Sequence, residues 1–476
     1  MPKMRASLRV TTLIAGALFM ELLDGTIIAT ALPQMGNSFH VGAIRLNIGM
    51  TAYMLTLAVF IPISGWVADR LGSRTVFASA IAVFTAASGL CGLATSLTQF
   101  ILFRILQGIG GALMVPVGRL IVLRTTPKEK LTQALALITW PALSALVIGP
   151  PLGGFITTYF GWHWIFFLNL PIGAVALVLT LLWIEEIVSS ERLPFDWSTF
   201  VLGGGASAAL VYGMERLGSD VAHWRLPAVI ILLSLASGVV AVLVARRHPE
   251  RSLIDFASMK YKTFSLSVNG ASAFRISVGV VPFLLPLMFQ LTFGLTAFQA
   301  GLYLLALFAG DFAMKSLIIP FLRWWGFRRI LIVNGVGVTL SIILCAAITL
   351  RTPVWLVVAI LFVHGCCRSL EFTSITTISY VDVPPERMSR ANSFLSAIMQ
   401  LGSGLGIAFG AITLSLVAAA RGHSANLPDL ADFRIALLLM SLLALGPVFD
   451  SLTLDPNAAA STSGHIERPK PVADAH

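Results

Sequence analysis

Residues 11–33 read TTLIAGALFMELLDGTIIATALP, an almost unbroken apolar run that contains two acids, Glu21 and Asp24. About 20 mostly apolar residues are enough for a helix to cross the hydrocarbon core of a bilayer. The basic residues Lys3, Arg5 and Arg9 precede the run, as in a secretory signal. The run is too long for such a signal and carries acids. We therefore interpret it as an uncleaved first membrane span.

Similar apolar runs recur along the rest of the chain. They account for its composition, because 57% of its 476 residues are hydrophobic and only 11% are charged. Soluble domains are roughly 45–50% apolar and about 25% charged. The composition thus excludes a soluble globular enzyme, a disordered protein and a disulfide scaffold. We expect an all-α membrane protein with fourteen spans, at residues 11–33, 47–68, 76–96, 99–123, 132–158, 163–184, 198–214, 226–245, 264–292, 297–321, 329–350, 354–380, 391–418 and 435–453.

The distribution of basic residues predicts an orientation. Fourteen spans put both termini on one side, and that side collects 21 Lys and Arg residues against 6 on the other, with 5 inside spans. Cytoplasmic loops are the ones enriched in Lys and Arg. We therefore predict a multi-pass protein of the bacterial inner membrane with both termini in the cytoplasm. The net charge of +10 then reflects topology and not nucleic-acid binding.

We expect the chain to divide into two related halves. The predicted parts are a six-helix bundle at 1–192, two additional spans at 193–246, a cytoplasmic linker at 247–262, a second six-helix bundle at 263–453 and a disordered tail at 454–476. A short repeat supports this division, since Leu71-Gly72-Ser73-Arg74 follows the second span and Trp325-Gly326-Phe327-Arg328 follows the tenth. Internal repeats are typical of transporters whose halves rock about a central site.

The connection between spans two and three contains Gly65-Trp-Val-Ala-Asp69-Arg70-Leu-Gly72-Ser-Arg74. An acid, two arginines and two glycines in a tight turn are suited to locking neighbouring helix ends together. We predict that this turn is a conformational switch loop; an ordinary charged loop is the alternative.

Polar groups inside the first and fourth spans are the candidates for proton coupling. Glu21 and Asp24 are three residues apart and share a helix face, and Arg104 and Gln107 do the same in span four. Charged groups within the bilayer are costly and must face a partner or a cavity. We predict that the acids Asp24 and Glu21 take up protons and that Arg104 faces a partner or a cavity. Structural roles, a hydrogen-bonding acid and a bracing arginine, are the alternatives.

The fifth span contains Ala145-Leu-Val-Ile-Gly149-Pro150-Pro151-Leu-Gly153-Gly154. Proline removes a backbone hydrogen bond from a helix, and glycines let another helix approach closely. We expect this span to kink and to pack tightly against a neighbour.

These motifs resemble signatures of the major facilitator superfamily. The turn resembles G-x-L-A-D-R-x-G-R-K, with Ser73 and Thr75 as departures. Arg104–Gly108 resembles R-x-x-Q-G, whose arginine is associated with proton handling in that family, so the resemblance implies a part in proton coupling for Arg104. Residues 145–154 look like the antiporter signature G-x-x-x-G-P-x-x-G-G, with Ala145 in place of the first glycine. The first span resembles L-D-x-T-I-x-x-x-A-L-P of fourteen-span drug:proton antiporters (EmrB/QacA-like), whose acid falls on Asp24. The resemblance implies two six-helix bundles with two extra helices between them, and drug efflux driven by protons.

Further charges are embedded in the second half. Arg275 lies in span nine, Asp311 and Lys315 lie four apart in span ten, and His364, Arg368 and Glu371 follow one face of span twelve. We list all six with Gln107 as candidate cavity-lining residues. In the alternative, Asp311 neutralises Lys315, Glu371 pairs with Arg368 and His364 only packs.

The sequence therefore predicts a proton-coupled exporter of small molecules or drugs and not an enzyme. We expect protons, a small-molecule substrate and the lipid bilayer as partners, a periplasmic adaptor as a further candidate, and no cofactor or metal. The cysteines Cys91, Cys345, Cys366 and Cys367 lie inside apolar runs and are expected to pack as small apolar residues. A facilitator or proton symporter that imports a metabolite is the alternative, and a membrane sensor or scaffold and a membrane-embedded enzyme are more distant ones.

Overall fold

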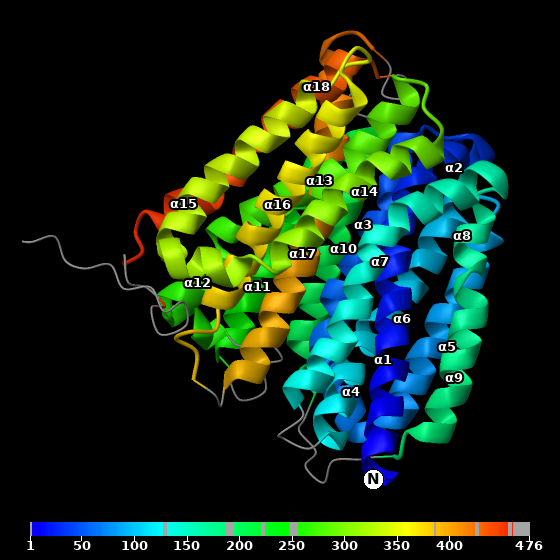
Figure 1. Ribbon diagram of the computed structural model, residues 1–476, viewed down its shortest axis with the longest axis vertical. Helices are drawn as coiled ribbons and strands as arrows, with labels where there is room; N and C mark the ends of the chain where they lie inside the picture. The colour runs from blue at the N-terminus through cyan, green and yellow to red at the C-terminus, as the bar shows by residue number, and fades with distance from the viewer. Residues whose placement is uncertain are drawn as a thin grey trace, which may run out of the picture.

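The computed structural model describes residues 2–126, 131–186, 195–219, 224–247, 256–384, 387–423, 428–455 and 459, and the regular elements in this part of the chain are all helices. Figure 1 shows the earlier helices gathered on one side of the molecule and the later ones on the other. The N-terminus lies at one end of α1, and α2 lies at the opposite end. Residues 248–255 of the predicted linker and nearly all of the predicted tail are outside the described residues.

The first half consists of the helices from α1 to α9, of which α6, α7 and α9 pack against α1. Their bounds are α1 Pro2–Ile27, η1 Ile28–Thr30, α2 Leu32–Phe39, η2 Ala43–Leu46, α3 Asn47–Phe60, η3 Ile61–Ile63, α4 Ser64–Leu71, α5 Ser73–Gly92, α6 Leu97–Thr125, α7 Leu131–Tyr159, α8 His163–Phe167 and α9 Asn169–Trp183. The two helices expected as additions follow as α10 Trp197–Ser219 and α11 Arg225–Arg247.

The second half begins with a broken helix and ends with another. Its bounds are η6 Phe256–Lys260, α12 Lys262–Val268, α13 Gly270–Leu291, α14 Ala297–Lys315, α15 Ile318–Ala346, α16 Val354–Ile378, α17 Met388–Ala420, α18 Leu430–Ser441, η8 Leu442–Leu445 and α19 Gly446–Ser451.

The helices agree with a polytopic membrane protein. Among the described residues, twelve helical stretches are long and apolar enough to cross a membrane, and Leu143–Tyr159 of α7 is a shorter apolar one. The remaining expected crossing corresponds to α10, which is 23 residues long. Fourteen crossings therefore stay a prediction, and so does the division into two six-helix bundles.

One expected span is too long. The sequence suggested a crossing at 297–321, but α14 ends at Lys315 and α15 starts at Ile318. Residues 318–325 form a separate helical piece, because α15 is interrupted at Gly326, whose φ of 70° is outside the helical region. Only glycine adopts this conformation without strain. The apolar composition of residues 318–321 hid this break, since apolar periodicity alone does not show where a helix turns.

The backbone supports the short internal repeat. Gly72 has φ 93° and Gly326 has φ 70°, so both aligned glycines make a left-handed turn before the next long helix. Arg74 Nη2 then donates to the Leu181 carbonyl oxygen at 2.7 Å, and Arg328 Nη2 donates to the Leu452 carbonyl oxygen at 3.1 Å. Each arginine thus reaches the end of the last long helix of its own half.

Helices α7, α10 and α3 join the halves, since α3 also packs directly against α17. α7 packs against α1 on one side and against α14 of the second half on the other. α10 packs against α11 and also contacts both α3 and α17. At the end opposite the N-terminus, Gln290 Nε2 donates to the Thr30 carbonyl oxygen at 3.1 Å, and the Phe298 amide donates to Thr158 Oγ1 at 3.1 Å.

Candidate functional site

A buried polar network forms around Asp24 of α1. Arg104 of α6 makes an ion pair with it, since Arg104 Nη1 lies 2.6 Å from Asp24 Oδ2. Gln107 Nε2 donates to Asp24 Oδ1 at 2.8 Å, and Arg104 Nη1 also donates to Gln107 Oε1 at 2.7 Å. All three side chains are at most 1% exposed. A buried charge without a partner would be strongly destabilising, so this pairing is what allows both ions inside the membrane.

The network extends to the sixth expected span. Asn169, the first residue of α9, donates from Nδ2 to Asp24 Oδ1 at 3.0 Å and to Ser88 Oγ at 3.0 Å. Ser88 Oγ in turn donates to the Phe166 carbonyl oxygen at 2.9 Å. The Asp24 carboxylate therefore accepts hydrogen bonds from three side chains, Arg104, Gln107 and Asn169. Both of its oxygens are used, which fixes the orientation of the carboxylate.

Glu21 lies one turn before Asp24 and has a different environment. It is 7% exposed, and Tyr53 OH donates to Glu21 Oε1 at 3.3 Å. The Tyr53 ring also stacks against Arg104, with the guanidinium carbon 4.2 Å from the ring centroid. Tyr53 therefore connects the two acids, because it contacts Glu21 through its hydroxyl and the partner of Asp24 through its ring.

The predicted switch loop lies at the same end as the N-terminus (Figure 1). Gly65, Asp69 and Arg70 belong to α4, where Arg70 lies over the Trp66 ring at 5.5 Å from the centroid. Asp69 is half-buried, and Gly72 and Arg74 form the turn into α5. The structure thus gathers the motif at one turn between two helix ends.

Glu186, just beyond α9, holds that turn in place. Its carboxylate accepts from the backbone amides of Arg74 at 3.1 Å and Thr75 at 3.2 Å, and from Thr75 Oγ1 at 2.5 Å. These amides belong to the first turn of α5, which has no partners within its own helix. A carboxylate at this position also interacts favourably with the helix dipole. The switch loop is therefore fastened to the end of the last helix of its half.

The glycines of the predicted antiporter motif lie at helix contacts. A Cβ atom on Gly149 would lie 3.0 Å from Thr26 Cβ, and one on Gly153 would lie 2.6 Å from Ile27 Cγ1, both in the chain segment of α1. On the other face, a Cβ on Gly154 would lie 2.7 Å from Phe298 Cα of α14. Pro150 meets α14 in the same way, because a Cβ on Gly301 would lie 2.8 Å from the Pro150 carbonyl carbon.

In the second half, Asp311 and Arg368 form an ion pair. Arg368 Nη2 lies 2.5 Å from Asp311 Oδ2, and the two side chains are 11% and 14% exposed. Lys315 Nζ donates to Thr373 Oγ1 at 3.0 Å. Asp311 therefore pairs across two helices with Arg368, and not with Lys315 one turn along its own helix.

The other two groups of the expected stripe on α16 turn towards α15. His364 Nδ1 is 2.8 Å from Ser341 Oγ, and Glu371 Oε2 accepts from Asn334 Nδ2 at 2.9 Å. Both His364 and Glu371 are 0% exposed. The partner of Glu371 is thus an amide and not the expected alternative, Arg368. The stripe divides, with Arg368 facing α14 and the other two facing the inside of their own half.

Arg275 lies at the break between α12 and α13. Asn269 has φ −78° and ψ −87°, outside the helical region, and Arg275 Nη1 donates to the Ser267 carbonyl oxygen at 2.5 Å. The side chain is 2% exposed and packs on Gly402 of α17, where a Cβ would lie 2.8 Å from Arg275 Cβ. The guanidinium therefore supplies a donor to a carbonyl that the broken helix leaves open.

A cluster of possible ligand atoms lies between α17 and α18. The ligand atoms of His423, Asp429 and Asp432 are within 4.8 Å of one another. Arg421 Nη1 donates to both carboxylates, at 2.6 Å and 2.7 Å, and its hydrogen bond lowers the pKa of Asp429 to about 2. These oxygens also cap α18. We assign the cluster a structural role in closing this connection.

Sequence reasoning missed Asn169, Tyr53 and Glu186. Asn169 had a usable signal, because an amide beside Pro171 inside an apolar run is costly unless it has a partner. Tyr53 had none, since aromatic residues are common in spans. The role of Glu186 depends on a contact over 111 residues of chain, which local sequence does not show.

Comparisons with known proteins agree with this architecture. A family model described as Major Facilitator Superfamily matches residues 14–407 and 269–449. The chain is 34% identical over 408 residues to the "Putative multidrug resistance protein MdtD" of Citrobacter koseri, with 85% of each chain covered. It is 35% identical over 407 residues to the protein of the same name from Escherichia coli O6:H1, again with 85% of each covered.

Solved structures show the same fold at low sequence identity. The POT family transporter PepTSo aligns with a TM-score of 0.66 at 12% identity, covering 93% of this chain and 96% of that one. A bacterial homologue of the human lysosomal transporter Spinster, in an inward-facing conformation, gives 0.65 at 16%, covering 95% and 97%. The xylose transporter XylE from E. coli gives 0.62 at 12%, covering 94% and 99%.

Proposed function

This chain belongs to the major facilitator superfamily, and from that premise we propose that it exports small molecules across the bacterial inner membrane in exchange for protons. It is a multi-pass membrane transporter and not an enzyme. Export of drugs is supported by the relatives, which are named as putative multidrug resistance proteins and cover most of the chain. The N-terminal and C-terminal residues lie in the cytoplasm in this proposal.

The observation that carries the proton-coupling part is the buried network of Asp24, Arg104, Gln107 and Asn169. An ion pair stabilises Arg104 only while Asp24 keeps its charge. A proton on Asp24 would therefore remove the ion pair and leave Arg104 to find another partner. Such a change has a two-state character, which is what coupling to a conformational change requires.

The α7 helix supplies the path from this network to the second half. Gly149 and Gly153 face Thr26 and Ile27 at the end of α1, less than one turn beyond Asp24, while Gly154 and Pro150 face α14. Helices in such close contact shift as rigid bodies, because packed interfaces do not deform continuously. We propose that protonation at α1 changes the fit of α7 against α14, and that the halves then rock about this contact. The turn with Asp69 would hold one of the two states.

Substrate leaves by the same cycle. With the cavity facing outward, Asp24, helped by Glu21, takes a proton from the outer side, and the substrate is released. The return step exposes the acid to the cytoplasm, where the proton leaves and a new substrate binds. No cofactor or ATP enters this cycle, which is driven by the proton gradient alone.

The test is proton/substrate exchange in everted vesicles from a host that lacks its major pumps. A panel of cationic and neutral drugs is added to energised vesicles, and proton movement is followed with a pH-sensitive dye. We expect drug-induced proton release with some members of the panel. A proton symporter that imports its substrate would instead accumulate it in intact cells, where the proton gradient has the opposite direction to that in everted vesicles. Assays in intact cells and in everted vesicles therefore distinguish an exporter from an importer. Release that also occurs with empty-vector vesicles would contradict the proposal.

A further inference from the structure

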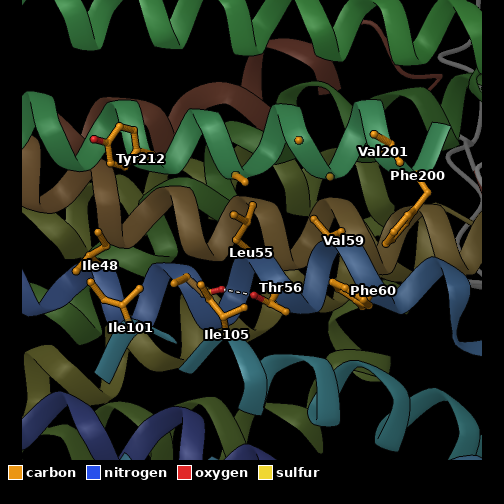
Figure 2. A pocket seen from close by; sticks show the side chains of 14 residues that line it. Ile48, Leu55, Thr56, Val59, Phe60, Ile101, Ile105, Phe200, Val201 and Tyr212 are labelled. Atoms are coloured by element: carbon orange, nitrogen blue, oxygen red, sulfur yellow. Dashed lines mark hydrogen bonds between the residues drawn. The ribbon is translucent and has the colours of Figure 1, made fainter. Parts of the chain in front are cut away.

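A cavity lies outside the acid network, between the additional helix α10 and the helices α3 and α6. Its volume is about 480 Å³. Figure 2 shows it running along the helices, with Ile48, Ile101 and Tyr212 at one end and Phe60 and Phe200 at the other. On α3, the stretch from Ile48 to Phe60 spans about 18 Å at 1.5 Å per residue. The cavity is therefore long and narrow and follows the direction in which the helices cross the membrane.

The walls of this cavity are almost entirely hydrocarbon. Of the lining side chains, only Thr56 and Tyr212 carry a polar atom. The Thr56 hydroxyl already donates to the Ala52 carbonyl oxygen at 2.7 Å. Water needs two to four polar partners to occupy a cavity. The two hydroxyls in the lining of this cavity are already hydrogen-bonded, so the cavity suits an apolar occupant.

The cavity opens towards the surrounding membrane. Two of its lining residues, Ile105 of α6 and Val201 of α10, are 37% and 60% exposed, and Leu102 beside it on α6 is 59% exposed. In a membrane protein, exposed apolar side chains between spanning helices face the acyl chains of lipids. The opening therefore connects the cavity to the bilayer and not to water.

The two sides of α10 differ in packing. On the side of the second half, Met214 is buried against Ala408 and Ile412 of α17. On the side of the first half, α10 contacts α3 beside the cavity, where a Cβ on Gly204 would lie 3.1 Å from Val59 Cγ1. The Phe60 and Phe200 rings close one end of the cavity at a centroid distance of 5.4 Å. An empty space of this size would lose contacts that protein interiors normally make.

The other end of the cavity carries residues of the types found at the membrane–water interface. Arg216 Nε donates to Tyr212 OH at 3.2 Å, and the guanidinium carbon lies 5.3 Å from the ring centroid. Trp224, which is 55% exposed, and Arg225 at the start of α11 follow after a short connection. Tyrosine, tryptophan and arginine near a helix end are typical of headgroup depth.

We propose that the cavity between α10, α3 and α6 holds one acyl chain of an anionic phospholipid, whose phosphate lies at Arg216 near Tyr212. The length fits, since about 18 Å is a little more than half of the ~30 Å hydrocarbon core, the depth that one leaflet supplies. The charge fits, because Arg216 stands at the mouth of an otherwise apolar cavity. The lipid fills the space that α10, α3 and α6 leave open beside the contact of α10 with α3.

Two neighbouring glycines provide a matched test. Gly205 lines the cavity, and a Cβ on it would meet nothing within 4 Å. Gly203, two residues earlier on α10, has the same open surroundings but is not among the lining residues. Gly205→Leu places a side chain in the stripe of Val201 and Ala208, while Gly203→Leu places the same side chain elsewhere on the helix.

The experiment uses the full-length protein in native membranes supplied with phosphatidylglycerol that carries a photoactivatable group in its acyl chain. After illumination, mass spectrometry maps the labelled peptides. We expect labelling of peptides with Ile105 and Val201, at least a threefold loss in Gly205→Leu, and no loss in Gly203→Leu. Arg216→Gln is expected to lower labelling by phosphatidylglycerol twofold or more while a lipid with a neutral headgroup labels weakly in both proteins.

Equal labelling of Gly205→Leu and Gly203→Leu would overturn the proposal. So would displacement of the label by a transported compound, because the occupant would then be substrate and not lipid. Unchanged labelling in Arg216→Gln would remove the headgroup contact from it. Protein yield and elution volume show that each variant folds, and the readout does not depend on transport, so a failure of the proposed function does not affect this result.

Discussion

At the scale of single residues, Asp24 and Glu21 differ in what they would have to give up to take a proton. Asp24 accepts from Arg104, Gln107 and Asn169, whereas Glu21 has one hydroxyl partner at a longer distance. A proton on Asp24 therefore changes a whole network, while a proton on Glu21 changes a single contact. In the proposed cycle, Asp24 is therefore better suited to trigger the conformational change, and Glu21 to assist in proton uptake.

The first prediction concerns coupling at this network. Asp24→Asn keeps the size of the side chain and removes its charge, so it should abolish uphill, drug-induced proton release while leaving some downhill drug movement. Glu21→Gln should have a milder effect, because the ion pair with Arg104 is intact. The measurement is the everted-vesicle assay with equal amounts of each protein.

Removing one partner of a buried ion pair costs about 3–5 kcal/mol, so Asp24→Asn must first be shown to elute as a folded monodisperse protein. If the variant is folded and still couples protons to export while Glu21→Gln does not, the roles of the two acids are reversed. If both couple normally, the proton carrier lies in the second half, where Glu371 and Asp311 are next.

Sequence alone placed Asp24, Arg104 and Gln107 on the right faces, because helical periodicity fixes which residues of one span share a side. The sequence did not predict which side chains of different helices contact one another. Glu371 lies three residues from Arg368, yet its contact is Asn334 of α15. Which neighbour a helix presents to a side chain depends on packing of the whole bundle, and this information is not local in the chain.

At the scale of elements, the switch loop depends on the end of α9. The Glu186 carboxylate caps the first turn of α5 and binds Thr75. We predict that Glu186→Ala lowers the free energy of unfolding by about 1 kcal/mol, as for other helix N-caps, seen as a lower midpoint in a thermal melt. Glu185→Ala is the control, since Glu185 is equally exposed on the same segment. An identical midpoint for both variants would show that the cap contributes nothing.

The contact of α7 with α14 is the second feature at this scale. Gly154→Leu forces a side chain into the α14 backbone near Phe298, and overpacking of this kind typically costs about 1–3 kcal/mol. We predict loss of drug export or a leaky membrane, measured as drug accumulation in intact cells. Gly16→Leu in α1 is the control, because a Cβ on Gly16 meets nothing within 4 Å. Full export by Gly154→Leu would remove the structural basis of the α7 pathway.

Among the elements, helix ends were easier to predict than helix breaks. Most expected spans agree with the helices to within a few residues, because charged and polar residues mark where a span leaves the membrane. The break at Asn269 was not predicted, because the expected span 264–292 runs through it. Asn269-Gly270 is a pair typical of turns, so the sequence carried a signal there. Gly326 lies in the connection expected between the spans that end at 321 and begin at 329, so the turn at this glycine agrees with the sequence.

At the scale of the whole molecule, the order of the helices predicts topology. Because the expected fourteen spans put 21 basic residues on the side of the N-terminus and 6 on the other, reporter fusions at Ala459 and in the connection at 218–223 should report opposite sides. A cytoplasmic reporter is expected to be active at Ala459 and a periplasmic one in the loop. Activity of the same reporter at both positions would mean that the number of spans or the orientation is wrong.

The same scale shows what a family likeness explains and what it leaves open. The repeat of Gly72 and Gly326, with Arg74 and Arg328 donating to equivalent helix ends, is visible both in sequence and in backbone conformation. These four residues support the predicted relation between the two halves. The sequence did not predict the cavity beside α10, because a gap arises from how three separate helices fit together.

The hydrogen bonds around Asp24 bear on whether such a transporter leaks protons when no substrate is bound. Many copies of many carriers share the proton gradient across one bacterial membrane. A carrier that conducted protons without substrate would dissipate this gradient. In the proposed cycle, a proton that arrives at Asp24 must displace a guanidinium and compete with two amides at once. The donors that bind this carboxylate would therefore limit proton leakage, so that a transporter without substrate dissipates little of the proton gradient.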